Sequence, residues 1–80
     1  MKHLEFRMER PNLVAVGDAV TVSESVLKTL QGKMYYYTID PAVAMSGNIP
    51  AKAKLNILHG VVTQIDDHGS LWTVHCEFED

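Results

Sequence analysis

The sequence predicts a small, mainly β domain that folds as a strongly bent antiparallel barrel. Three observations support this fold class. Apolar and polar residues alternate with a period of two near both ends of the chain, as they do in half-buried strands. Turn signals containing Gly, Asp and Pro separate the short apolar segments. The length of 80 residues allows one domain, over residues 1–80, with one small core.

The first part of the chain contains two predicted strands. Residues 3–10 alternate cleanly and place three apolar side chains on one face, namely Leu4, Phe6 and Met8. Pro11 and Asn12 end this strand, and Gly17-Asp18 is a turn signal. A second strand follows over residues 19–23.

The middle of the chain contains two helix signals on either side of a strand. Residues 23–32 predict a helical turn packed on the sheet, with Ser23 or Ser25 as N-cap and Val26, Leu27 and Leu30 on one face before Gly32. Residues 34–39 are rich in tyrosine and β-branched residues, which favours a strand. Residues 40–47 have Asp as a cap, Pro in the first turn and Gly beyond the end, which predicts a second short helix.

The last part predicts a hairpin. Residues 48–54 (NIPAKAK) form a loop, and residues 55–65 form the first arm of the hairpin. Residues 66–69 form its turn. The second arm covers residues 72–78, with one face directed to the core through Trp72, Val74, Cys76 and Phe78.

Two glycine-containing segments carry a resemblance. Val16-Gly17-Asp18-x-Val20-x-Val22 is similar to the entry strand of SH3-like small barrels, including modules of the KOW type. Gly60-x-Val62-x-x-Ile65-Asp66, followed by a strand, resembles the core of the KOW motif. The resemblance covers about a third of the chain and implies an SH3-like barrel. In the compact motif the two glycines lie close together, whereas a long insertion separates Gly17 from Gly60 here.

The charge is distributed unevenly along the chain. The formal net charge is −3. Residues 26–58 carry four lysines against one aspartate, and residues 59–80 carry five acidic residues and no Lys or Arg. Because neutralisation of phosphates supplies most of the affinity for nucleic acids, this balance disfavours a general nucleic-acid binder. Because residues 26–58 are basic, a local contact with RNA remains an alternative.

Catalytic, metal and cofactor sites are not expected. His59, His68, His75 and Cys76 lack the paired spacing of zinc ligands, and Cys76 lies on the predicted core face. No glycine-rich phosphate loop is present. We therefore expect no enzyme and no cofactor. The single cysteine favours the cytoplasm, and the sequence shows neither a signal peptide nor an apolar run long enough to cross a membrane.

The tyrosine run is the best functional candidate. On a strand, Tyr36 faces away from Tyr35 and Tyr37, so one face of the run leaves aromatic rings partly exposed unless the insertion covers it. Exposed aromatic rings near lysines bind protein partners or stack on bases. The candidate binding residues are Lys33, Tyr35, Tyr37, Lys52 and Lys54. The sequence favours a module that binds a protein partner through residues 33–54. The alternatives are a KOW-like module that contacts RNA or the ribosome, with Lys28 as a further contact, and a homodimer with paired edge strands.

Overall fold

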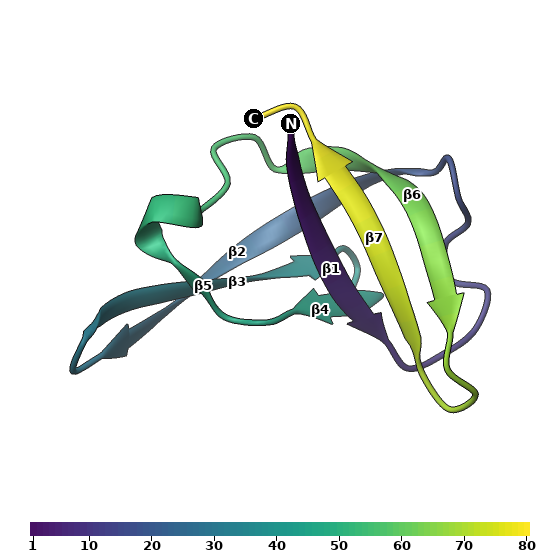
Figure 1. Ribbon diagram of the computed structural model, residues 1–80, viewed down its shortest axis with the longest axis horizontal. Coiled ribbons are helices and arrows are strands. Elements are labelled where there is room, and N and C mark those ends of the chain that lie inside the picture. Colours follow the sequence, from purple (N-terminus) through teal and green to yellow (C-terminus); the bar gives the residue numbers. More distant parts are fainter.

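The computed structural model describes residues 1–80 as seven strands and one short 3-10 helix (Figure 1). The strands are β1 (Lys2–Met8), β2 (Ala19–Thr29), β3 (Gly32–Ile39), β4 (Ala44–Ser46), β5 (Ile49–Pro50), β6 (His59–Asp67) and β7 (Trp72–Phe78). The 3-10 helix η1 covers Ala51–Ala53. The structure contains no helix that could cross a membrane.

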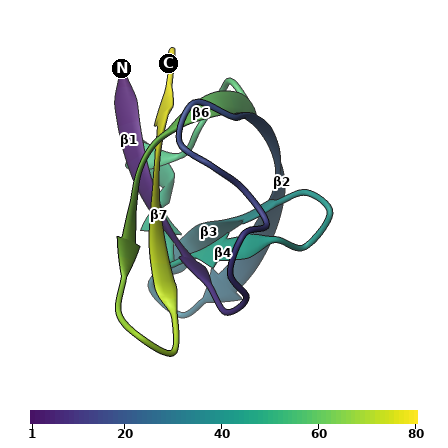
Figure 2. The same ribbon diagram turned by 90° about the vertical axis from the view of Figure 1, so that its right-hand side faces the viewer.

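Six of the strands form a closed antiparallel ring. They pair in the order β2-β6-β7-β1-β4-β3, and the pairing of β2 with β3 closes the ring, which is seen end-on in Figure 2. The short strand β5 adds to the far end of β3. The predicted mainly β barrel is therefore confirmed, and the ring is consistent with the SH3-like class.

The core is built from the alternating faces that the sequence predicted. It contains twelve buried residues, all of them apolar or aromatic. Phe6 and Met8 of β1 are buried there, with Val74, Cys76 and Phe78 of β7. The first and last strands pair along their whole length, so these two faces meet in the centre of the barrel.

Gly60 and a β-bulge explain the spacing of the Gly60–Ile65 segment. A Cβ atom at Gly60 would overlap the carbonyl oxygen of Glu77 and would lie 2.8 Å from the ring of Phe78, so only glycine fits there. The register between β6 and β7 shifts between Val62 and Gln64. Because this bulge adds one residue, Val62 and Ile65 both face inward although they are three positions apart.

The helical turn predicted for residues 23–32 is wrong. This segment is the second half of β2, and it pairs residue by residue with β3 up to the turn at Leu30 and Gln31. A short helix is marginal without tertiary packing, and here the neighbouring strand supplies a complete ladder instead. Val26 and Leu27 consequently lie on opposite faces of a strand, opposite Tyr35 and Met34.

The helix predicted for residues 40–47 is also wrong. The chain turns after Ile39, whose carbonyl accepts hydrogen bonds from the N–H groups of Ala42 and Val43. It then forms β4, which pairs with both β3 and β1 and buries Ala44. These residues are extended because β4 lies between β3 and β1 and pairs with both strands. The one helical turn in the insertion is η1.

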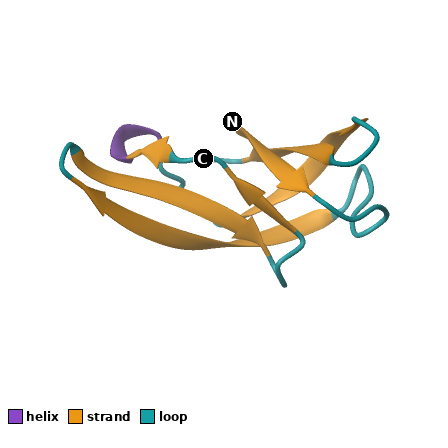
Figure 3. Ribbon diagram, turned by 90° about the horizontal axis from the view of Figure 1, so that it is seen from below, coloured by secondary structure: helices purple, strands orange, loops and turns teal.

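The β2–β3 hairpin extends beyond the ring. β2 contacts β6 only through residues 19–21, whereas it pairs with β3 from Val22 to Thr29. We call the outer half of the hairpin, residues 25–36, the arm. Figures 1 and 3 show the arm projecting from one end of the barrel along the longest dimension of the molecule, which is 36 Å.

Candidate functional site

One edge of β2 is unpaired along the arm. The N–H of Val22 points away from β3 and donates to the carbonyl of Leu58 at 2.8 Å. Backbone groups in an antiparallel pair alternate between the partner strand and the opposite side. Because the register to β3 is unbroken, Glu24, Val26 and Lys28 also direct their N–H and C=O groups away from β3. On that side β6 pairs with β2 only at residues 19–21, and no strand pairs with residues 24–28.

Exposed apolar side chains accompany this edge. Val26 is 48% exposed and Leu27 is 40% exposed, and the side chain of Leu30 at the hairpin tip is fully in solvent. Soluble domains usually shorten, charge or cover such an edge. Here the edge is long and two exposed apolar side chains, Val26 and Leu27, lie along it, which favours pairing with another strand.

The arm is also basic. It contains Lys28 and Lys33 and no acidic residue. These two lysines lie directly opposite each other in the ladder. Like charges in that position destabilise a hairpin, so an acidic group bound between them would relieve a repulsion that the isolated arm contains.

Tyr37 is a core residue that fixes the base of the arm. Its ring has no exposed surface, so it offers nothing to a partner. Its hydroxyl donates to Glu24 Oε1 at 2.9 Å and accepts the backbone N–H of Leu55 at 2.7 Å. Burial, which is the largest effect, and the nearby Glu24 carboxylate raise the pKa of Tyr37 to about 12, despite the opposing hydrogen bond from Leu55. The hydroxyl therefore stays protonated and holds two segments together.

The other candidate residues are divided between two places. Lys54 Nζ lies 3.2 Å from Glu24 Oε1 and 5.3 Å from the centroid of the half-buried Tyr35 ring, so Lys54 and Tyr35 join Tyr37 in one cluster. Lys33 lies on the arm, near its tip. Lys52 is exposed on η1 and forms no ion pair. The structure thus unites three of the five candidates, and their contacts are with the protein itself.

The residues of the free edge were not predicted from the sequence, because they were assigned to a helix. Val20, Val22, Glu24 and Val26 lie at every second position, so the period of two that is typical of a strand continues past Ser23. This period was the feature of the sequence that indicated a strand at the free edge. The pairing of the first strand with the last was also missed, and it brings together side chains more than 70 positions apart.

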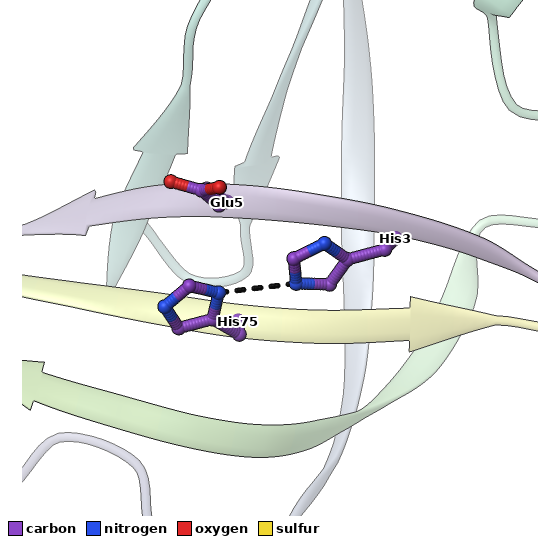
Figure 4. A group of neighbouring side chains, drawn as sticks. All are labelled: His3, Glu5 and His75. Carbon is purple, nitrogen blue, oxygen red and sulfur yellow. Dashed lines mark hydrogen bonds between the residues drawn. The ribbon is translucent and has the colours of Figure 1, made fainter.

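A polar cluster lies on the outer face of β1 and β7 (Figure 4). Glu5 is directly opposite His75 in the ladder, and His3 is two residues away on β1. His3 Nε2 lies 3.1 Å from His75 Nδ1, and the two rings are within 2° of parallel. His75 Nε2 lies 2.8 Å from Asp66 Oδ2 on β6. Hydrogen bonds from Gln64 and then from His75 hold the pKa of the Asp66 carboxyl below its usual value.

The remaining histidines and the cysteine do not join this cluster. His59 is exposed, and His68 lies 3.0 Å from the Thr73 hydroxyl near the β6–β7 turn. Cys76 is fully buried in the core, and burial raises the pKa of its thiol to about 11. A protonated buried thiol behaves as a small apolar group, as the sequence predicted for this position.

A surface hollow of about 740 Å³ lies between the end of β1 and the turn that leads into β4. Arg7, Arg10 and Met45 are among its lining residues. The polar and charged residues that line the hollow are exposed or half-buried, so the hollow lacks the converging buried polar groups that orient a small ligand.

Comparison with known proteins finds no matching family model, no matching curated sequence and no matching solved structure. The resemblance to KOW modules therefore has no support from a family match.

Proposed function

We propose that this protein is a non-enzymatic interaction module that binds a protein partner by accepting an extended segment along the free edge of β2. The observation that carries the proposal is the edge itself, where Glu24, Val26 and Lys28 direct backbone donors and acceptors toward solvent. Addition of a strand would satisfy these groups and cover the exposed apolar side chains beside them. The working surface thus moves from residues 33–54 to the arm, residues 25–36.

The charge of the arm defines the chemistry of the partner. Lys28 and Lys33 are paired with no carboxylate. A partner strand with apolar residues at alternate positions and an acidic residue near the tip of the arm fits this surface best. Electrostatic complementarity of this kind contributes more to specificity and to the association rate than to affinity.

The experiment compares matched variants as baits. Val26→Pro removes one outward-directed N–H, and it leaves the ladder to β3 intact because Val26 does not donate to β3. Val61→Thr is the control. Val61 is also an exposed strand valine, at 44%, but its strand has neighbours on both sides. Some proteins will be retained by wild type and by Val61→Thr but not by Val26→Pro. These proteins are identified and purified for titration.

We expect Val26→Pro to weaken binding of the purified partner about tenfold or more, since one backbone hydrogen bond and the packing of a valine are lost. Val61→Thr is expected to bind like wild type. A partner that binds all three proteins equally would contradict strand addition at this edge, provided that circular dichroism shows each variant to be folded.

Two other functions can be distinguished from strand addition, the first with Val26→Pro and the second with charge-reversal variants of Lys28 and Lys33. A homodimer formed through β2 would show a concentration-dependent mass in sedimentation that Val26→Pro abolishes. A KOW-like RNA contact would rest on Lys28, Lys33 and Lys52, because Lys54 is paired with Glu24. A few phosphate contacts on a chain of net charge −3 predict weak binding at physiological salt. Tight RNA binding that is lost on charge reversal at Lys28 and Lys33 would favour this alternative.

The proposal places the module in the cytoplasm, on the grounds of its single cysteine. Cys76 is buried and has no disulfide partner, so the domain needs no oxidising compartment to fold.

A further inference from the structure

The strongest unassigned feature is the cluster of His3, Glu5 and His75 on the outer face of the β1–β7 pair (Figure 4). The three side chains come from the first and last strands of the barrel, and their ligand atoms lie within 4.8 Å of one another. The cluster lies on β1 and β7 and the arm belongs to the β2–β3 hairpin, so the two sites share no residue.

The two histidines present facing ring nitrogens. His3 Nε2 and His75 Nδ1 are 3.1 Å apart. Two nitrogen ligands bound about 2.0–2.1 Å from a tetrahedral zinc ion lie about 3.3 Å from each other. The observed separation is therefore close to one edge of a zinc coordination tetrahedron.

Asp66 selects the tautomer that a metal at this position requires. Its carboxylate only accepts hydrogen bonds, so the proton of the neutral His75 ring lies on Nε2, which is 2.8 Å from Asp66 Oδ2. The lone pair of His75 is then on Nδ1, where it accepts a hydrogen bond from His3 Nε2–H when no metal is bound. Zinc would replace this hydrogen bond, with the proton of the neutral His3 ring on Nδ1. Gln64 Nε2 donates to the other oxygen of Asp66 at 2.7 Å and orients it. A carboxylate behind a ligating histidine is a recurring feature of zinc sites.

Glu5 supplies the third ligand. It lies opposite His75 in the ladder, and its side chain is exposed, so its carboxylate is free to rotate toward the two nitrogens. Glu5 forms no ion pair that would hold it elsewhere.

We propose that His3, His75 and Glu5 bind one Zn²⁺ ion, with Asp66 as the positioning residue and water as the fourth ligand. Two imidazoles and one carboxylate suit zinc better than magnesium or calcium, which prefer oxygen ligands. This proposal departs from the expectation that the chain holds no metal, because that expectation used spacing along the sequence and these ligands meet across strands. Bound zinc would connect the two terminal strands of the barrel.

The test is a zinc titration of the full chain after removal of metals with a chelator. We expect one zinc per chain at micromolar concentration, and a rise in Tm of about 10–20 °C at a zinc concentration of a hundred times Kd. Magnesium is expected to give neither effect.

Variants locate the site. His3→Gln and His75→Gln should each weaken zinc binding about tenfold or more, and Asp66→Asn should weaken it by about 10–100-fold with the stoichiometry unchanged. His59→Gln is the control, because His59 lies outside the cluster, and it should bind like wild type. Thermal melts without zinc establish that each variant is folded. The absence of saturable zinc binding to wild type would overturn the proposal, as would affinity that is unchanged in folded His3→Gln and His75→Gln.

Discussion

Replacement of Tyr37 by phenylalanine tests whether the tyrosine run stabilises the barrel or serves as a binding surface. The change removes one hydroxyl and leaves the buried ring in place. Two hydrogen bonds are lost with it, one to the Glu24 carboxylate at 2.9 Å and one from the backbone N–H of Leu55 at 2.7 Å. Leu55 is itself buried, so water does not readily replace the hydroxyl there.

The magnitude of the loss depends on these two contacts. A hydrogen bond to a charged group contributes about 1.5–3 kcal/mol, and a buried donor left without a partner costs about 1–3 kcal/mol. The two effects share one atom and do not add fully, so we expect Tyr37→Phe to lower the free energy of unfolding by about 2–4 kcal/mol. For a domain of this size that corresponds to a fall in Tm of about 10–25 °C.

The assay is urea denaturation followed by Trp72 fluorescence, with Tyr36→Phe as the matched control. Tyr36 lies on the opposite face of β3, and its hydroxyl forms no hydrogen bond within the protein. Tyr36→Phe should change the free energy of unfolding by less than about 0.5 kcal/mol. Equal values for the two variants would refute the structural role assigned to the Tyr37 hydroxyl.

Two further predictions concern the core. Gly60→Ala should destabilise the barrel by roughly 1–3 kcal/mol, because the new methyl group meets backbone and an aromatic ring. Gly47→Ala is the control, since its methyl group faces open space and should cost less than about 0.5 kcal/mol. Chemical denaturation measures both variants, and equal losses of stability would contradict the close packing at Gly60. The Cys76 thiol has a pKa of about 11 against an ordinary 9.0, so it ionises first in the unfolded chain. Its contribution to stability is present below pH 9 and is lost between pH 9 and 11, by roughly 2–3 kcal/mol. Urea titrations from pH 8 to 11 should show a smaller alkaline loss for Cys76→Ala, and the same loss in both proteins would show that the thiol is not responsible.

The sequence predicted the strands and core residues of the barrel correctly in those strands that bury only one face. Alternation identified the core residues of β1 and β7, such as Phe6 and Val74, because a period of two directly reports burial on one side. The segment after Ser23 is ambiguous by the same criterion. Its apolar residues fit one face of a helix as well as both faces of a strand, and only the partner strand, which lies beyond the turn at Leu30, decides between them.

The candidate sites were less predictable, because both depend on neighbours across strands. The sequence identified Tyr35, Tyr37 and Lys54 as a group, yet it contained no sign that Glu24 would bind Tyr37 and Lys54 at the base of the arm. The meeting of His3 with His75 likewise requires the pairing of the chain ends, which results from the closed ring and from no local pattern.

Amide hydrogen exchange along β2 reports whether this strand has a free edge that is open to a partner. Measured by NMR on dilute protein, the N–H groups of Val26 and Lys28 should exchange rapidly, because they face solvent, while that of Leu27 should be protected by its bond to β3. A partner that adds a strand should then protect Val26 and Lys28. Protection of Val26 and Lys28 equal to that of Leu27 in the isolated protein, at every concentration, would show that the edge is already covered and would contradict strand addition at β2.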